Sequence, residues 1–222
     1  MVPLSLVWYA LLGYLLFTAY TILATRMKRG AAATVVGVAT LAPVLLTAIP
    51  WAPSLAIHLP CHRNWTWLPT WMLRSSPMGS TLLTVDGTRV KVCYGRPAAR
   101  GRTMLGGGNV PFGHLWRTGA NEPTTIIAPV PISVAGLPMP AGRASLYSVP
   151  GPETWELILN ASTSQWGIES EYSDAVRARE IGRTIVPSQS NGEHVERLTI
   201  EPDPEGLVLQ WERTKVRIPV RR

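Results

Sequence analysis

Two uncharged hydrophobic runs at the start of the chain constrain its fold more than any other feature. The first, 4–25, has no charged side chain. As a helix it would span about 33 Å, against about 30 Å for the hydrocarbon core of a bilayer. The second, 31–51, is also uncharged and of similar length, and Pro43 predicts a kink in it. We expect residues 1–51 to form a hairpin of two transmembrane helices.

Two other interpretations of these runs are less consistent with their composition. A cleaved signal peptide would carry a basic segment before an apolar run of about 7–15 residues, whereas this chain begins Met-Val-Pro-Leu-Ser and continues into a longer run. A soluble helical hairpin would need a much larger protein to cover two such uncharged segments.

The turn between the two runs predicts the topology. Residues 26–30 read Arg-Met-Lys-Arg-Gly, and basic loops stay in the cytoplasm. We therefore expect the turn inside and both ends of the hairpin on the outer side of a cytoplasmic membrane. Neither run contains His, Asp, Glu, Lys or Arg, which argues for anchoring and packing rather than transport or redox chemistry. Small residues in 31–39 favour close helix contact, either with another membrane protein or within the hairpin itself.

Charge is distributed unevenly along the chain. All 14 acidic residues occur from Asp86 onward, and five of the 21 basic residues precede it. The remaining 16 bases and 14 acids give the rest of the chain a net charge of only +2. Nucleic-acid binding needs a basic patch on the folded domain, so this composition does not favour it.

Residues 52–74 form a bridge that is unusually aromatic for a linker. Trp51, Trp65, Trp67 and Trp71 accompany Arg63 and Arg74 without one acidic residue. This composition suits a segment in the interfacial layer of a membrane, or one that contacts a neighbouring subunit.

Cysteine and histidine in the bridge do not predict a metal site. A c-type haem signature would need a cysteine at position 58, and no second ligand cluster accompanies His58, Cys61 and His62. We expect no metal and no cofactor. Cys61 and Cys93 could form a disulfide on the outer side of the membrane or remain free and buried, and both possibilities stay open.

From about residue 75 the pattern changes to short alternating strands. The segments 82–85 and 88–94 flank Asp86-Gly87, a strong hairpin signal, with Val90, Val92 and Tyr94 on one face. Further strands are predicted at 124–134, 144–149, 154–159, 196–201, 206–212 and 214–220, with a helical piece at 172–180. The fold class is therefore mainly β: an extracytoplasmic β-sandwich or small barrel over residues 75–222, preceded by two transmembrane helices.

Short motifs across this domain match a bacterial family in order and spacing. They are Tyr94-Gly95-Arg96-Pro97, Gly101-Arg102, Val110-Pro111-Phe112-Gly113, Leu115-Trp116-Arg117-Thr118-Gly119-Ala120-Asn121-Glu122, Thr124-Thr125, Pro140-Ala141-Gly142, Ser145-Leu146-Tyr147-Ser148-Val149-Pro150-Gly151, Trp155, Asn160 and Gln165-Trp166-Gly167. On these motifs the chain resembles the domain of unknown function 2911 over about Ser75–Val220. The resemblance implies an exported or lipid-anchored bacterial β domain, hence the periplasmic side of the inner membrane, and no established reaction. The triple glycine at 106–108 and the membrane hairpin depart from the family pattern.

One dense polar cluster lies beside the predicted core: His114, Arg117, Asn121 and Glu122. Arg117 could fork onto a carboxylate or phosphate, and Glu122 with His114 could act as acid and base. The structural interpretation is a buried network that orders the loop before strand 124–134, and we favour it. The triple glycine is no phosphate loop, and Ser145, Ser148 and Ser162 fit no nucleophile elbow.

Two functional hypotheses follow. The first is a non-catalytic accessory subunit of a larger membrane complex, such as a photosynthetic or respiratory one, with other membrane subunits and the bilayer as partners. The second is a membrane-tethered ligand-binding or hydrolytic domain that uses Arg117, Asn121 and Glu122. The absence of a legible catalytic pattern favours the first, which is not an enzyme.

Overall fold

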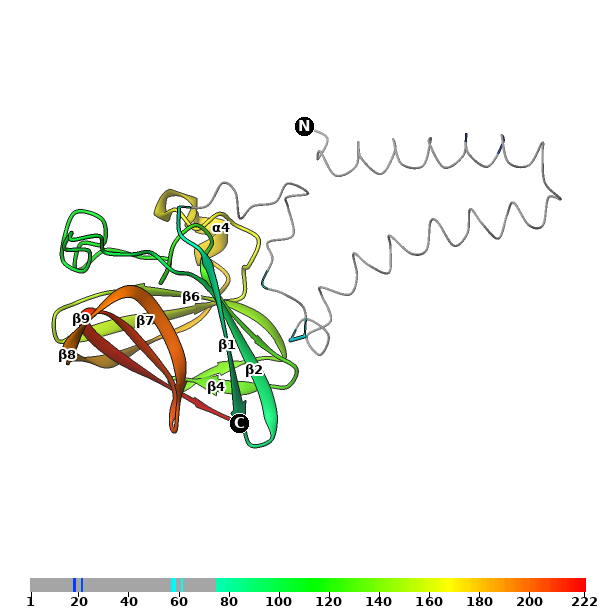
Figure 1. Ribbon diagram of the computed structural model, residues 1–222. Helices are drawn as coiled ribbons and strands as arrows, with labels where there is room; N and C mark the ends of the chain where they lie inside the picture. Colours follow the sequence, from blue (N-terminus) through cyan, green and yellow to red (C-terminus); the bar gives the residue numbers. More distant parts are fainter. Residues whose placement is uncertain (1–17, 19–20, 22–56, 59–60, 62–74) are drawn as a thin grey trace. The chain divides into compact units, whose positions relative to one another are not determined.

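The computed structural model describes residues 18, 21, 57, 58, 61 and 75–222 (Figure 1). The chain divides into two compact units, Met1–Trp51 and Ala52–Arg222. The predicted helices 4–25 and 31–51 and the turn 26–30 fall outside the described residues, as do Trp51, Arg63, Trp65, Trp67, Trp71 and Arg74. In the part of the chain that is described, no helix has the length and apolar character needed to cross a bilayer.

Nine strands carry the described part of the second unit. They are β1 (Met78–Val85), β2 (Thr88–Gly95), β3 (Thr124–Ala128), β4 (Ile132–Val134), β5 (Leu137–Met139), β6 (Gly142–Val149), β7 (Thr154–Asn160), β8 (Glu180–Asp203) and β9 (Gly206–Arg221). They form one antiparallel sheet in the order β1-β2-β3-β6-β7-β8-β9-β4-β5 (Figure 1). The prediction of a mainly β fold is confirmed.

The first hairpin forms where the sequence predicts it. Val85 pairs with Thr88, and Asp86 and Gly87 both have positive φ, 46° and 74°. Two consecutive positive φ values are what a two-residue turn with the twist of the strands requires. Val90 and Val92 are fully buried on the inner face, as the alternation predicts.

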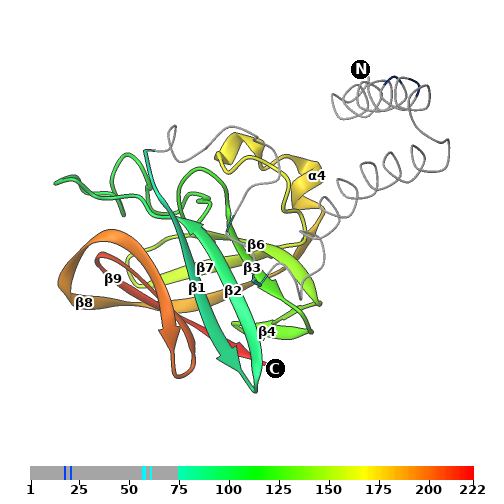
Figure 2. The same ribbon diagram turned by 45° about the vertical axis from the view of Figure 1, so that its right-hand side comes forward.

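The last two strands are longer than predicted. The segment 196–201 is the end of the 24-residue β8, and 206–212 and 214–220 join into the 16-residue β9. β8 pairs with β7 through its first residues and with β9 through its later ones (Figure 2). Its register with β9 shifts between Ser190 and Thr199. Glu212 has a φ of 53° and lies opposite Val195 at such a shift, so β9 bends where the prediction placed a break.

The predicted helix 172–180 is much shorter in the structure. α4 covers only Asp174–Arg177, and the 3-10 turn η3 covers Glu169–Glu171. Glu180 already belongs to β8, because the sheet extends that strand back along β7 as far as Asn160. Pairing with β7 therefore ends the helical segment before Glu180.

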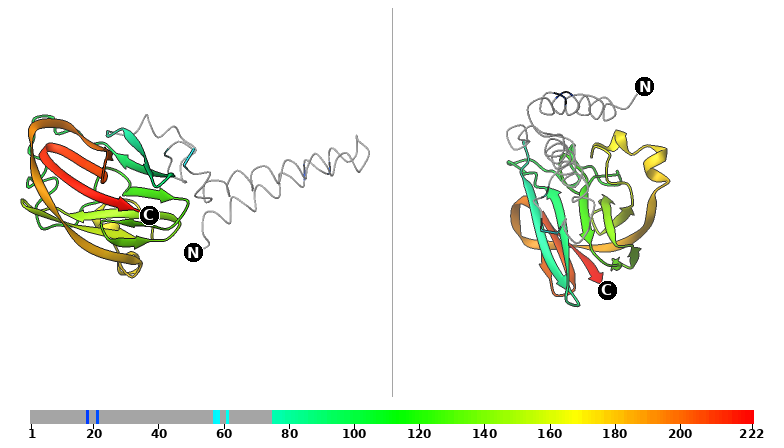
Figure 3. Two further views of the ribbon diagram at one scale, coloured as in Figure 1. Left: turned by 90° about the horizontal axis from the view of Figure 1, so that it is seen from below. Right: turned by 90° about the vertical axis from the view of Figure 1, so that its right-hand side faces the viewer.

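The sheet curves round on itself (Figure 3). Every strand contributes to its main hydrophobic core. The edge strand β1 and its neighbour β2 approach the last part of β8 without a continuous backbone ladder. Beyond β2, Arg96 donates from Nε to the carbonyl of Leu198 at 3.2 Å, and Leu198 donates to the carbonyl of Pro97 at 2.9 Å. The last part of β8 is thus fastened to β1 and β2 by side chains and a short extension of β2.

Candidate functional site

Trp116 opens the polar loop and is itself a core residue. Its backbone exchanges two hydrogen bonds with Ser148 of β6, at 2.7 and 2.8 Å. Its ring stacks on Trp211 at 5.7 Å and meets the edge of Trp155 at 5.8 Å. The indole Nε1 of Trp116 donates to the carbonyl of Gly119 at 3.0 Å, which folds the loop back on its first residue.

The middle of the loop is fixed by tight backbone contacts. Thr118 has a φ of 52°, and its hydroxyl donates to that of Ser148 at 2.9 Å. The carbonyl of Thr118 accepts from the hydroxyl of Thr124 at 2.7 Å. A Cβ at Gly95 would lie 1.9 Å from the carbonyl oxygen of Ala120, so only glycine fits where β2 passes this loop.

Arg117 forks onto a carboxylate that the sequence did not reveal. Its Nε and one terminal nitrogen bond Glu169 at 3.3 and 3.2 Å, and the other terminal nitrogen donates to the carbonyl of Asn121 at 3.4 Å. The side chains of Arg117 and Glu169 are 20% and 41% exposed. Glycine at position 167 lets the segment before Glu169 approach the loop closely, because a Cβ there would lie 2.1 Å from the carbonyl oxygen of Asn121.

The side chains of Asn121 and His114, two other residues of the predicted cluster, bond other parts of the chain. Asn121 has a φ of 67°, and its amide donates to the carbonyl of Ser76 at 3.3 Å, which fastens the start of the domain. His114 is exposed, and its Nδ1 lies 3.1 Å from the carbonyl oxygen of Phe112. Glu122 is half-buried.

A second, more deeply buried polar network lies between β6, β7 and α4, and the sequence analysis missed it. Asn160 is fully buried and donates to the carbonyl of Val176 at 2.8 Å. Its side-chain oxygen accepts from the backbone of Ser162 at 2.7 Å, and Gln165 donates to the hydroxyl of Tyr147 at 2.9 Å. Asn160 and Gln165 belong to the family motifs, and this membership was the sequence signal that could have pointed to the network.

Tyr172 links this network to charged residues on β8. Its hydroxyl donates to Glu180 at 2.7 Å, and Arg183 bonds the same carboxylate at 2.7 and 2.8 Å. Burial and the bond to Glu180 raise the pKa of Tyr172, so it stays a neutral phenol. The hydrogen bond from Arg183 lowers the pKa of Glu180, and the same bond raises the pKa of Arg183.

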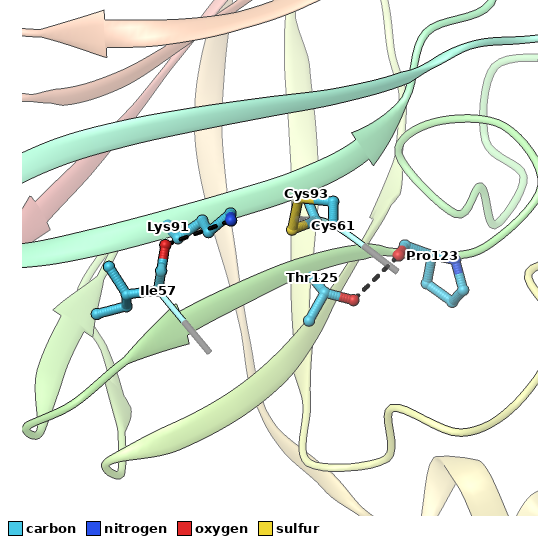
Figure 4. The surroundings of a disulfide bond; sticks show 6 residues. All are labelled: Ile57, Cys61, Lys91, Cys93, Pro123 and Thr125. Atoms are coloured by element: carbon cyan, nitrogen blue, oxygen red, sulfur yellow. Dashed lines mark hydrogen bonds between the residues drawn. A yellow bond between two sulfur atoms is a disulfide. The ribbon is translucent and has the colours of Figure 1, made fainter. Parts of the chain in front are cut away.

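Cys61 and Cys93 are joined in a disulfide, with their Cα atoms 5.6 Å apart (Figure 4). Ile57 packs on Ile127 of β3 beside Cys93, and Lys91 donates to the carbonyl of Ile57 at 3.3 Å. These contacts attach the described bridge residues to the outer face of β2 and β3. They also explain why Lys91 is buried although the alternation of β2 directs it away from the core.

Metal binding finds no support in the described residues, which contain no group of three His, Cys, Asp or Glu side chains placed to hold an ion. Cys61 is committed to the disulfide, and His58 lies 3.0 Å from Arg89 through its Nε2.

Comparison with known proteins gives one match. A family model described as protein of unknown function (DUF2911) matches residues 76–220. No curated protein and no solved structure shows a significant match. The matched span includes the tryptophan-centred loop, its Glu169 partner segment and the Asn160 network. The chain belongs to the DUF2911 family.

Proposed function

We propose that this protein is a non-catalytic accessory subunit of a larger bacterial membrane complex, such as a photosynthetic or respiratory one. Its two hydrophobic runs anchor it in the inner membrane, and its β domain stands on the periplasmic side. Other membrane subunits bind the helices and the tryptophan-rich bridge.

The hydrogen bonds that Arg117 and Asn121 make within the chain are the observation that carries this proposal. Both were strong candidates for contacts with a substrate. Instead, the side chain of Arg117 bonds Glu169, and that of Asn121 bonds the carbonyl of Ser76. Neighbouring residues of the family motifs also have structural roles. Trp116 stacks on Trp211 in the core, Thr118 has a positive φ in a tight turn, and Gly95 allows close backbone contact. A site with these residues serves to shape a rigid domain, which suits a structural subunit.

The disulfide supports the periplasmic location. Disulfides persist in oxidising compartments and are rare in the cytosol. Cys61 lies between the predicted membrane hairpin and the β domain, so its bond to Cys93 favours placing both the bridge and the domain outside. This agrees with the cytoplasmic turn predicted at 26–30.

Native electrophoresis of membranes solubilised in a mild detergent tests the proposal. We expect the wild type to migrate with a large complex and a variant carrying W65A, W67A and W71A to leave it, because tryptophans are the residues most enriched at binding hot spots. F112A, at an aromatic residue of the β domain that is 41% exposed, is the matched control. A wild-type protein that migrates alone at its own mass would contradict the proposal.

A second candidate function is a tethered domain that binds an anionic ligand at Arg117. The partial exposure of the Arg117–Glu169 pair favours it, since a ligand carboxylate or phosphate could displace Glu169 without reaching the core. Calorimetric titration of the detergent-solubilised protein with inorganic phosphate and acetate tests it. Binding that R117A abolishes would support this function. The absence of measurable binding to either anion would contradict it.

A further inference from the structure

One outer face of the sheet combines basic and apolar side chains across four strands. The register places Leu82 opposite Lys91, Lys91 opposite Ile127, and Ile127 opposite Arg143. These residues alternate with inward side chains of the core, so they share the outer face. Together with Arg89, two residues along β2 from Lys91, they form a surface that we call the cationic face.

Among the residues that the structure describes, the strand register places no carboxylate on the cationic face. Burial and the charge of Arg143 lower the pKa of Lys91, and burial lowers the pKa of Arg143. The bridge cannot add an acid, because the first 85 residues contain none. Asp86, in the exposed turn of the first hairpin, is the acidic residue nearest in sequence.

Part of this face is open to solvent. Arg89 is exposed, Arg143 is half-buried, and Leu82 is 48% exposed although it is a large apolar side chain. An exposed leucine beside arginines is the combination found on protein surfaces that lie in the headgroup layer of a membrane.

The chain itself limits how far this face can lie from the predicted membrane boundary. Ile57 packs on Ile127 of the face, and His58 contacts Arg89. Cys61 is bonded to Cys93 (Figure 4). From position 51, where the second hydrophobic run ends, six residue steps reach Ile57. Even fully extended they cover about 20 Å.

We propose that the cationic face binds the phosphate groups of anionic phospholipids at the membrane surface. The inference rests on the proposed function, because it requires the hydrophobic runs to be in the bilayer. Arg89 and Arg143 then contact lipid phosphates while Leu82 enters the interface between headgroups and acyl chains.

Photo-crosslinking of the full chain in lipid nanodiscs tests this proposal. Benzoylphenylalanine replaces Thr84, an exposed residue opposite Arg89, and in a separate protein replaces Ile185, which is 70% exposed on β8. Nanodiscs contain phosphatidylcholine alone or with phosphatidylglycerol, and mass spectrometry measures the phospholipid adducts. The variants R89Q and R143Q remove charge, R89K keeps it, and R213Q removes a charge from exposed Arg213, which bonds Gly192.

Adducts at position 84 that require phosphatidylglycerol, with few at position 185, are the expected result. R89Q should reduce them about fivefold, the usual effect of one basic residue near an anionic surface, whereas R89K and R213Q should not. Equal labelling at the two positions, or labelling that ignores lipid charge, would overturn the inference and leave the anchor in place. Release of the protein from native membranes by alkaline carbonate would instead overturn the proposed function, and the inference with it.

Discussion

The phenol oxygen of Tyr94 bonds both backbone groups of Ile200, 106 residues further along the chain. It accepts from the Ile200 nitrogen at 2.9 Å and donates to the Ile200 carbonyl at 3.1 Å. Thr81 donates to the same carbonyl. The ring of Tyr94 passes over Gly79, where a Cβ would lie 3.0 Å from it. The side chains of Tyr94 and Thr81 thus replace backbone pairing where β1 and β2 meet the last part of β8.

Tyr94→Phe should therefore destabilise the protein by about 1–3 kcal/mol, the usual cost of leaving a buried backbone donor without its partner. Thermal unfolding followed by near-UV circular dichroism measures the effect. Thr84→Val, at an exposed position of β1, serves as the control and should change little. Equal stability of the Phe variant and the wild type would show that β2 and the last part of β8 are held together by other contacts.

Removing the disulfide should lower the free energy of unfolding by about 3–4 kcal/mol, because Cys61 and Cys93 are 32 residues apart and close a loop of that size in the unfolded chain. Denaturant unfolding of the wild type and of C61S/C93S measures the difference. Reductant should reproduce the loss in the wild type and have no effect on the double variant. Alkylation of both cysteines in protein isolated without reductant would contradict a disulfide in the cell.

Arg117→Ala should cost no more than about 1 kcal/mol, because exposed ion pairs contribute about that much and the pair with Glu169 is partly open to solvent. Glu169→Ala should cost a similar amount. A double-mutant cycle on unfolding free energies isolates the coupling between them. A loss of several kcal/mol for Arg117→Ala would show that the pair behaves as a fully buried network.

Glu180 should contribute to stability in a pH-dependent way. Its pKa is lowered below 4.5 in the folded protein, so its contribution is present above the unfolded pKa and is lost as the pH falls through the folded value. Glu180→Gln keeps an acceptor for Tyr172 and removes the charge. The difference in melting temperature between the wild type and this variant should be largest near neutral pH and should shrink below about pH 4.5. A constant difference would contradict the prediction.

The topology predicts opposite accessibility for two introduced cysteines. A cysteine at position 28, in the basic turn, should be protected from a membrane-impermeant thiol reagent in cells with a permeabilised outer membrane. A cysteine at position 205, in the exposed turn between β8 and β9, should react. Reaction at 28 with protection at 205 would invert the proposed orientation.

The sequence by itself determined the local elements of the β domain. Asp86-Gly87 specifies a two-residue turn through its positive φ values, and the alternation of Val90 and Val92 assigns the inner face of β2. The family motifs likewise located the loop from Trp116 to Glu122. Such features depend on neighbours within a few residues, so they can be predicted from the amino-acid sequence alone.

Only the tertiary structure decided which distant residues meet. The partner of Arg117 is Glu169, 52 residues away, and the partner of Tyr94 is Ile200. The first half of β8 escaped prediction because few of its side chains are buried, so backbone pairing with β7 defines it rather than an apolar pattern. Lys91 is buried because Ile57 covers it. Each of these contacts depends on packing between segments that the chain order leaves far apart.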